Sequence, residues 1–211
     1  MGSLVAFIYG TALFGSTYLL PLYIQMGQGL SAALVGTTML PAGIVLAFTI
    51  PLAGRLSDRV PIHLMISIGI VLLASSFALM ATLGLHAVLW VLVAWTILGR
   101  IGLGFILPSL NNGAMQGMAH HLISQASSTI NFLRMLGGAA GVSLCGIILQ
   151  WRLAAHGAES AAAPPSAARL AAFDETFVLL ALVCALAVLA AWRLRQPSVT
   201  GRPSGKGSST E

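Results

Sequence analysis

The chain has 211 residues, of which 57% are hydrophobic and 7% are charged, and its mean hydropathy is +0.93. Soluble domains carry about 25% charged residues, so this composition excludes an ordinary soluble domain and indicates an integral membrane protein. The net charge of +5 comes from arginines at the ends of apolar runs and in the tail, so it reports orientation in a bilayer and does not point to nucleic acid.

Six apolar runs are each long enough to cross a bilayer at about 1.5 Å per residue. We therefore predict an all-α integral membrane fold, with six transmembrane helices in residues 1–195 and a disordered cytoplasmic tail over residues 196–211. The predicted spans are residues 4–23, 32–52, 62–83, 87–108, 124–149 and 173–192, and the two longest linkers are residues 109–123 and 150–172.

The outer end of the first span carries two tyrosines and a glutamine, Tyr18, Tyr23 and Gln25. These side chains could line a substrate cavity. Amphipathic aromatic residues also form the belt at a membrane surface, so both interpretations remain open.

The loop over residues 53–61 fixes the orientation of the spans. Arg55 and Arg59 flank its centre, and arginines near span ends are retained on the cytoplasmic side. Asp58 can cap the next helix, and Pro61 suits its first turn. We therefore expect this loop to be cytoplasmic.

The other basic residues extend this orientation to the whole chain. Six of the ten Lys and Arg residues then lie on the cytoplasmic side: Arg55, Arg59, Arg193, Arg195, Arg202 and Lys206. Only Arg152 and Arg169 lie outside. We predict a multi-pass protein of the plasma (inner) membrane with both termini in the cytoplasm.

Two arginines fall inside predicted spans, where each costs about 2.5–3.5 kcal/mol on insertion scales. Arg100 lies eight residues before Pro108, about 12 Å from the cytoplasmic end of its span. A gate-closing role and a role in substrate or proton coupling both remain open for it. Arg134 lies about 15 Å deep, where a functional role is expected.

Arg134 belongs to a stripe of small and polar residues along one helical face. Spacing by three and four residues aligns Ser127, Asn131, Arg134, Gly138 and Gly141. Gly137 and Gly141 form a G-x-x-x-G pair that permits close approach of another helix.

The sequence gives no support for enzymatic chemistry. It has no phosphate-cradling glycine loop or hydrolase motif, its histidines lack ligand spacing, and Cys145 and Cys184 lie in apolar spans, so we expect no metal or cofactor. We also expect no Asp or Glu inside the six spans, which would place a proton-carrying carboxylate elsewhere.

Three segments carry a family resemblance. The segment Gly54-x-Leu56-x-Asp58-Arg59 resembles the signature loop between the second and third helices of each half of major facilitator superfamily transporters, although Pro61 stands near the usual second glycine. Arg100-x-x-x-Gly104 followed by Pro108 is similar to the fourth-helix pattern, with Leu103 replacing the usual glutamine. Asn131-x-x-Arg134-x-x-Gly137-Gly138-x-x-Gly141 resembles the fifth helix in the C-terminal half of the EmrB/QacA-like, fourteen-helix drug:proton antiporters.

The resemblance implies a C-terminal six-helix half, built as a 3+3 inverted repeat, that works with an N-terminal half absent from this chain. It implies efflux of small hydrophobic or cationic drugs in exchange for protons, with Gly54, Arg55, Asp58 and Arg59 in a gating loop. The first and fourth helices would line the cavity, the second and fifth would pack against the other half, and the third and sixth would face lipid. The stripe around Arg134 would then face the other half.

Two alternatives remain open. The chain could be a truncated membrane fragment without transport activity, or a six-span permease that acts as a homodimer.

Overall fold

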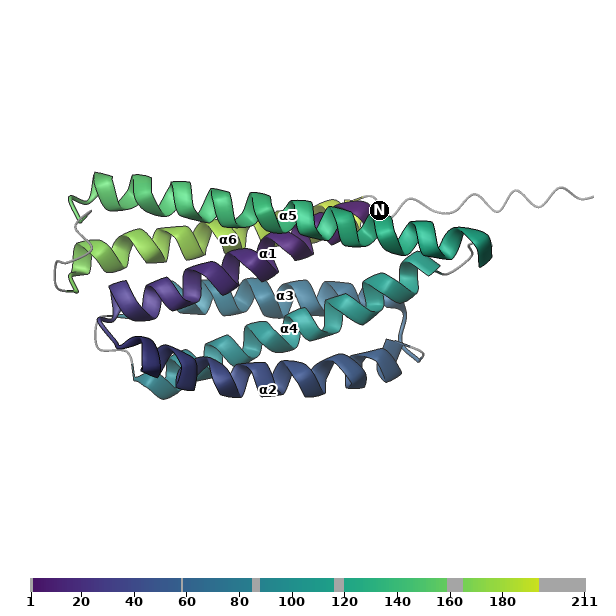
Figure 1. Ribbon diagram of the computed structural model, residues 1–211, viewed down its shortest axis with the longest axis horizontal. Coiled ribbons are helices and arrows are strands. Elements are labelled where there is room, and N and C mark those ends of the chain that lie inside the picture. Colours follow the sequence, from purple (N-terminus) through teal and green to yellow (C-terminus); the bar gives the residue numbers. More distant parts are fainter. Residues whose placement is uncertain (1, 58, 85–87, 116–119, 159–164, 194–211) are drawn as a thin grey trace, which may run out of the picture.

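The computed structural model describes residues 2–57, 59–84, 88–115, 120–158 and 165–193; Asp58 and the predicted tail over residues 196–211 lie outside this part. The described residues form six α-helices and no strand, which confirms the all-α prediction (Figure 1). The helices are α1 (Gly2–Leu22), α2 (Ala32–Ser57), α3 (Ile62–Met80), α4 (Leu89–Met115), α5 (His120–Ala155) and α6 (Ala167–Arg193), and a π-helical segment, η1 (Tyr23–Gly27), continues α1.

Five stretches of the described residues are long and apolar enough to cross a membrane: 4–27, 32–57, 62–80, 89–112 and 123–155. Helix α6 is not among these five. Its first turns carry Arg169, Asp174 and Glu175. A multi-pass membrane protein follows from the five spans, and the sixth crossing stays a prediction.

The predicted linkers are shorter in the structure because the helices run past the apolar spans. Residues 109–115 complete α4, and residues 120–123 begin α5. Residues 150–155, Gln-Trp-Arg-Leu-Ala-Ala, are mostly good helix formers, so α5 continues to Ala155. The chain then turns at Gly157, which has a φ of +64°. Hydropathy locates a membrane span but does not define the ends of its helix.

Two of the helix pairs match a 3+3 repeat, whereas the extensive α3–α4 contact has only a small counterpart between α1 and α6. Helix α1 packs mainly on α5, α2 packs on α4, and α4 and α6 both pack on α3. Exchanging α1–α3 with α4–α6 converts the α1–α5 pair into the α4–α2 pair. In Figure 1, α1, α2, α4 and α5 lie toward the viewer, with α3 and α6 behind them.

Glycines make the closest helix contacts. A Cβ atom at Gly10 of α1 would overlap the carbonyl oxygen of Arg134, and one at Gly137 of α5 would overlap the carbonyl oxygen of Phe7. Gly102 of α4 also lies close to the backbone of α3, where its Cβ would be 2.6 Å from the oxygen of Gly69. These backbones touch only because a side chain is missing at each crossing.

The core lies between α1, α3, α4 and α6. At the end of the core beside η1 lies an aromatic cluster in which Tyr23 makes edge contacts with Phe173 and Phe177, at centroid distances of 5.7 and 5.4 Å. Phe77 of α3 stacks on Phe177. All four side chains are buried, so this cluster ties η1, α3 and α6 together.

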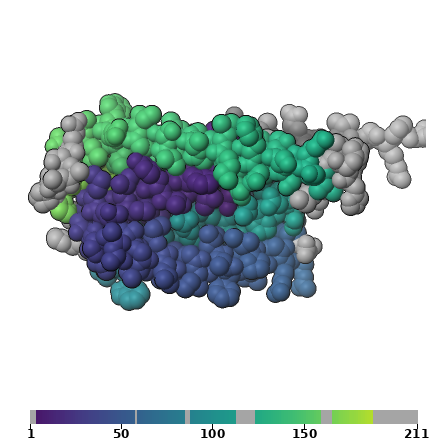
Figure 2. Space-filling model, in the orientation of Figure 1, coloured from purple at the N-terminus to yellow at the C-terminus, as the bar shows by residue number. Residues whose placement is uncertain are grey.

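The face toward the viewer is flanked by α2 and α5. Figure 2 shows this face, with α1 and part of α4 between the two flanking helices. Helix α2 exposes large apolar side chains, including Leu40, Phe48 and Leu52, which are 60, 74 and 61% exposed. Helix α5 exposes Phe132 and Ile147 in the same way. Such surfaces suit lipid or further membrane helices.

Candidate functional site

The two intramembrane arginines lie near a tyrosine that the sequence did not single out. Tyr9 of α1 is 4% exposed, and its hydroxyl is within electrostatic reach of both Arg100 on α4 and Arg134 on α5. The next residue, Gly10, touches the backbone of Arg134. The packing of α1 between α4 and α5 therefore brings together three residues that are far apart in the chain.

Arg134 is only partly satisfied. Its Nη2 donates a hydrogen bond to Oδ1 of Asn131, one turn earlier on α5. Its Nε is buried and has no hydrogen-bond partner within the described residues. Asn131 and Ser127 are exposed on the same helix. Buried N–H groups normally have an acceptor, so this nitrogen calls for one that the described residues do not supply.

Arg100 is half-buried, and the described part of the chain gives it no hydrogen bond or ion pair. The ion pairs found there lie at the other end of α5, where Glu175 accepts from Arg152 at 3.0 Å and lies 3.4 Å from His156. The start of α6 packs near Tyr23 of η1, and Tyr23 lies about 21 Å along the helix from Tyr9, which marks the arginine site. The two arginines thus form a cationic site away from the described carboxylates.

The glycine part of the predicted stripe packs inside this chain. Gly137 lies against Phe7, Gly138 against Phe14 and Gly141 against Thr11, all on α1. This corrects the expectation that the whole stripe faces a missing half. Helix α1 covers only one section of α5, so Ser127 and Asn131 remain exposed while the glycines do not.

The three candidates at the C-terminal end of the first span, Tyr18, Tyr23 and Gln25, are placed differently from one another. Tyr18 and Gln25 are exposed, as a lining or belt position requires. Tyr23 is fully buried, and its hydroxyl accepts a hydrogen bond of 3.0 Å from Nε2 of Gln28. Tyr23 therefore packs the core and does not line an open cavity, which corrects that candidate; the pattern of a single apolar run could not show which residues face inward.

The expectation of acid-free spans is wrong for the sixth predicted span. Asp174 and Glu175 are the second and third residues of residues 173–192, and both lie within α6. Glu175 is paired with Arg152, whereas Oδ1 of Asp174 is buried without a partner in the described chain.

The predicted gating loop is anchored to α4. Gly54 and Arg55 belong to the last turn of α2, and Arg59 is exposed after it. Nδ2 of Asn112 donates a hydrogen bond of 2.6 Å to Oγ of Ser57. Sequence reasoning placed Asn112 in a linker and so missed this contact, which needs α4 to continue as a helix beside α2.

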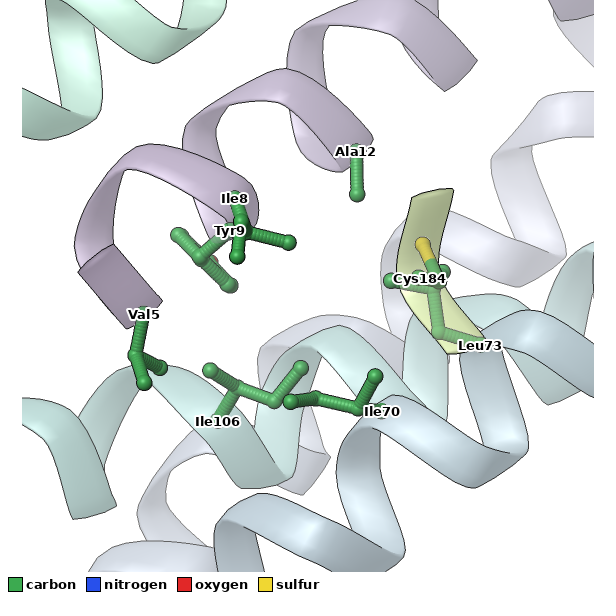
Figure 3. A pocket seen from close by; sticks show the side chains of 8 residues that line it. All are labelled: Val5, Ile8, Tyr9, Ala12, Ile70, Leu73, Ile106 and Cys184. Atoms are coloured by element: carbon green, nitrogen blue, oxygen red, sulfur yellow. The ribbon is translucent and has the colours of Figure 1, made fainter. Parts of the chain in front are cut away.

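A narrow apolar pocket with a cavity volume of about 10 Å³, about the space of one water molecule, lies beside Tyr9 (Figure 3). Ligand sites usually have about 300–1,000 Å³, so this space alone is too small for a drug-sized molecule. Its lining comes from four helices: Val5, Ile8, Tyr9, Ala12, Ile70, Leu73, Ile106 and Cys184. Among the described residues, no three His, Cys, Asp or Glu side chains cluster as metal ligands would.

The sequence matches the model of the Major Facilitator Superfamily over residues 2–142, which is most of the chain and includes α1 to α4 and the arginine site. The chain belongs to this superfamily. It is therefore a multi-pass membrane protein of a transporter family and not an enzyme.

Named relatives are resistance and multidrug proteins of bacteria. The chain is 26% identical to the multidrug transporter protein MdtP of Bacillus subtilis, over 71% of this chain and 28% of MdtP. It is 26% identical to the methylenomycin A resistance protein of Streptomyces coelicolor, over 91% of this chain and 38% of the relative. It is 26% identical to the colistin resistance protein EmrB of Acinetobacter baumannii, over 74% of this chain and 30% of the relative. The matched part of the chain thus spans about a third of the length of these relatives.

Proposed function

We propose that this chain is the C-terminal helical half of a secondary active multidrug efflux transporter, and that the face formed by α1 and α4 is one wall of its cavity. The observation that carries the proposal is the pair of intramembrane arginines around Tyr9. A charged side chain at this depth has a high free-energy cost of insertion when it faces lipid. It is tolerated when it contacts a protein partner or a water-filled cavity.

A further helical portion would cover α2 and α5. On α2, a Cβ atom added at Gly36 or Gly43 would meet no atom of a neighbouring helix within 4 Å, so a second helix could approach their backbone closely. The length of the relatives supports this partner, since each of the three is much longer than its matched region. A second copy of the same chain could instead cover these two helices.

The proposed substrates are small hydrophobic drugs, because the relatives carry the names of multidrug or antibiotic resistance. Cationic drugs would need acidic residues from the remainder of the transporter, since Arg100 and Arg134 repel a cation from this half.

Exchange for protons requires a carboxyl group that can take up and release a proton. Asp174 is the first acid to test, because Oδ1 of its carboxyl group has no described partner, whereas Glu175 is held by Arg152.

We further propose an inner-membrane location with cytoplasmic termini. Reporter fusions after Arg59 and Arg195 should then be active in the cytoplasm, and a fusion after Ala161 should be active outside. An opposite result at Arg59 would overturn the orientation.

The function is tested in everted membrane vesicles that contain the chain alone, the chain with the remaining helices of the transporter, or neither. Proton-driven uptake of a fluorescent drug is expected only when both parts are present. Uptake by the chain alone would favour the homodimeric permease. Correct insertion of both parts without any uptake would favour the fragment without transport activity.

A further inference from the structure

The closest helix contacts join α1 to α5. The two backbones touch at Gly10, Gly137 and Gly141, and Oγ1 of Thr11 donates a hydrogen bond of 2.9 Å to the oxygen of Gly137. Backbones in direct contact cannot slide past each other without breaking this packing. Helices α1 and α5 therefore behave as one rigid unit, which we call the α1–α5 pair.

The other four helices are joined to one another in the same way. Gly102 of α4 lies against the backbone of α3, and Oγ of Ser76 on α3 donates a hydrogen bond of 2.7 Å to the oxygen of Trp95 on α4. Asn112 ties α4 to Ser57 of α2. Helix α6 packs mainly on α3. We call α2, α3, α4 and α6 the four-helix unit.

The seam between the two units, where α1 meets α6, is apolar along most of its length. Leu180 of α6 lies against Gly15 of α1. Further along, Cys184 of α6 and Ala12 of α1 line the narrow pocket of Figure 3. Packed apolar helices can shift against each other without breaking a hydrogen bond. This seam is therefore easier to open than either unit.

The polar contacts that join the two units in the described chain lie at the η1 end. Nη1 of the buried Arg169 on α6 donates to the oxygen of Met26 in η1 at 3.4 Å. Nε2 of Gln28, directly after η1, donates at 3.2 Å to the oxygen of Gly84, which follows α3. A buried cation in the first turn of a helix is unfavourable, so the contacts that Arg169 makes account for its position.

The same end carries an ion pair and an irregular backbone. Arg152 of α5 lies 3.0 Å from Glu175 of α6, which joins the two units a second time. In η1, the N–H of Gln28 donates to the oxygen of Tyr23, five residues earlier. Single π-helical turns of this kind interrupt the regular helical ladder, so η1 gives α1 a place to bend.

We propose that Gln28, Arg152, Arg169 and Glu175 form a clasp that holds the α1–α5 pair against the four-helix unit. When the clasp opens, η1 bends and the α1–α5 pair tilts away from α6 along the seam. The crossing of α1 and α5 stays closed during this movement. The device is a property of this chain, so it goes beyond the proposed transport function and does not depend on it.

The two cysteines of the chain distinguish this movement from general unfolding. Cys184 is 1% exposed and lies at the seam, whereas Cys145 is 3% exposed and lies at the α1–α5 crossing beside Gly15. The purified chain in phosphatidylcholine vesicles is treated with N-ethylmaleimide, and mass spectrometry of its peptides gives the labelling rate of each thiol. Opening of the clasp exposes Cys184 alone, whereas unfolding exposes both.

Gln28→Leu removes one side of the clasp. We expect Cys184 to be labelled about fivefold faster, the effect of losing about one net hydrogen bond, and Cys145 to be labelled at the parent rate. Asn112→Ala is the matched control, because it removes a hydrogen bond within the four-helix unit and should change neither rate. Circular dichroism of each variant checks that the helices are intact.

A disulfide can close the clasp again. A Cβ atom built on Gly29 would lie 3.9 Å from the Cβ atom of Pro165, which precedes α6, and disulfides have Cβ–Cβ distances of about 3.5–4.5 Å. Gly29→Cys with Pro165→Cys is therefore added to the Gln28→Leu chain. Oxidation should return the labelling of Cys184 to the parent rate, and prior reduction with dithiothreitol should restore the fast rate.

Several results would overturn the inference. They are an unchanged rate at Cys184 in Gln28→Leu, an equal increase at Cys145 and Cys184, failure of the disulfide to form, and fast labelling of Cys184 after it has formed. The labelling requires no transport. Absence of drug uptake together with the expected labelling pattern would therefore reject only the proposed function.

Discussion

The crossing of α1 and α5 should be intolerant of a single added methyl group. In Gly137→Ala, the new Cβ would overlap the carbonyl oxygen of Phe7, so the helices must move apart. Overpacking of this kind costs about 1–3 kcal/mol. The shift also weakens the hydrogen bond of 2.9 Å that Oγ1 of Thr11 donates to the oxygen of Gly137, a loss of about 0.5–1.5 kcal/mol.

Helix propensity acts in the opposite direction, since alanine stabilises a helix interior by about 0.8–1 kcal/mol relative to glycine. The expected net loss for Gly137→Ala is therefore about 1–3 kcal/mol. Gly43→Ala is the matched control, because Gly43 is also in a helix but has open space where its Cβ would stand. That variant should be more stable than the parent chain by up to about 1 kcal/mol.

The assay is unfolding of the purified chain in mixed micelles by increasing dodecyl sulfate, followed by circular dichroism. Gly137→Ala should lower the denaturation midpoint, whereas Gly43→Ala should leave it unchanged or raise it. If the two variants shift the midpoint equally and in the same direction, the close contact between α1 and α5 is wrong.

Substitutions at two other contacts should change stability less, and substitution of one acidic residue should change transport. Asn112→Ala should cost about 1 kcal/mol and speed amide hydrogen exchange near Ser57, because it removes their 2.6 Å hydrogen bond; unchanged exchange there would count against the anchor. Glu175→Gln should change the denaturation midpoint little and only at low salt, because its pair with Arg152 is partly exposed. Asp174→Asn in the complete transporter should reduce proton-driven export while export down a drug gradient persists; unaffected proton-driven export would remove Asp174 as the proton carrier.

The helical fold could be predicted because each apolar run is too long for anything except a span or a large core. The helix ends could not, since apolar character stops at the membrane surface while helix propensity continues through residues 150–155 and 109–115. Asp174 has the same cause. Hydropathy does not fix the first residue of a span, so an acidic residue near that end can be counted inside or outside the span.

The arginine site was predicted in part. Arg100 and Arg134 stand out because charge inside an apolar run is rare. Tyr9 does not stand out, because a tyrosine in such a run is ordinary and its closeness to both arginines depends on how α1 packs between α4 and α5. The glycines of the stripe share a helical face with Arg134, but periodicity does not say how far along that face α1 extends.

The role of this site in transport is tested most directly by export from cells that carry Arg134→Ala in the complete transporter, with membrane abundance measured in the same cells. The substitution removes a half-buried cation and the cost of inserting it, so abundance should stay near that of the parent protein. Export should fall at least about tenfold, the effect of losing one charge-assisted hydrogen bond, and Arg152→Ala should export normally. Normal export by Arg134→Ala, or a fall in export that matches a fall in abundance, would contradict the account.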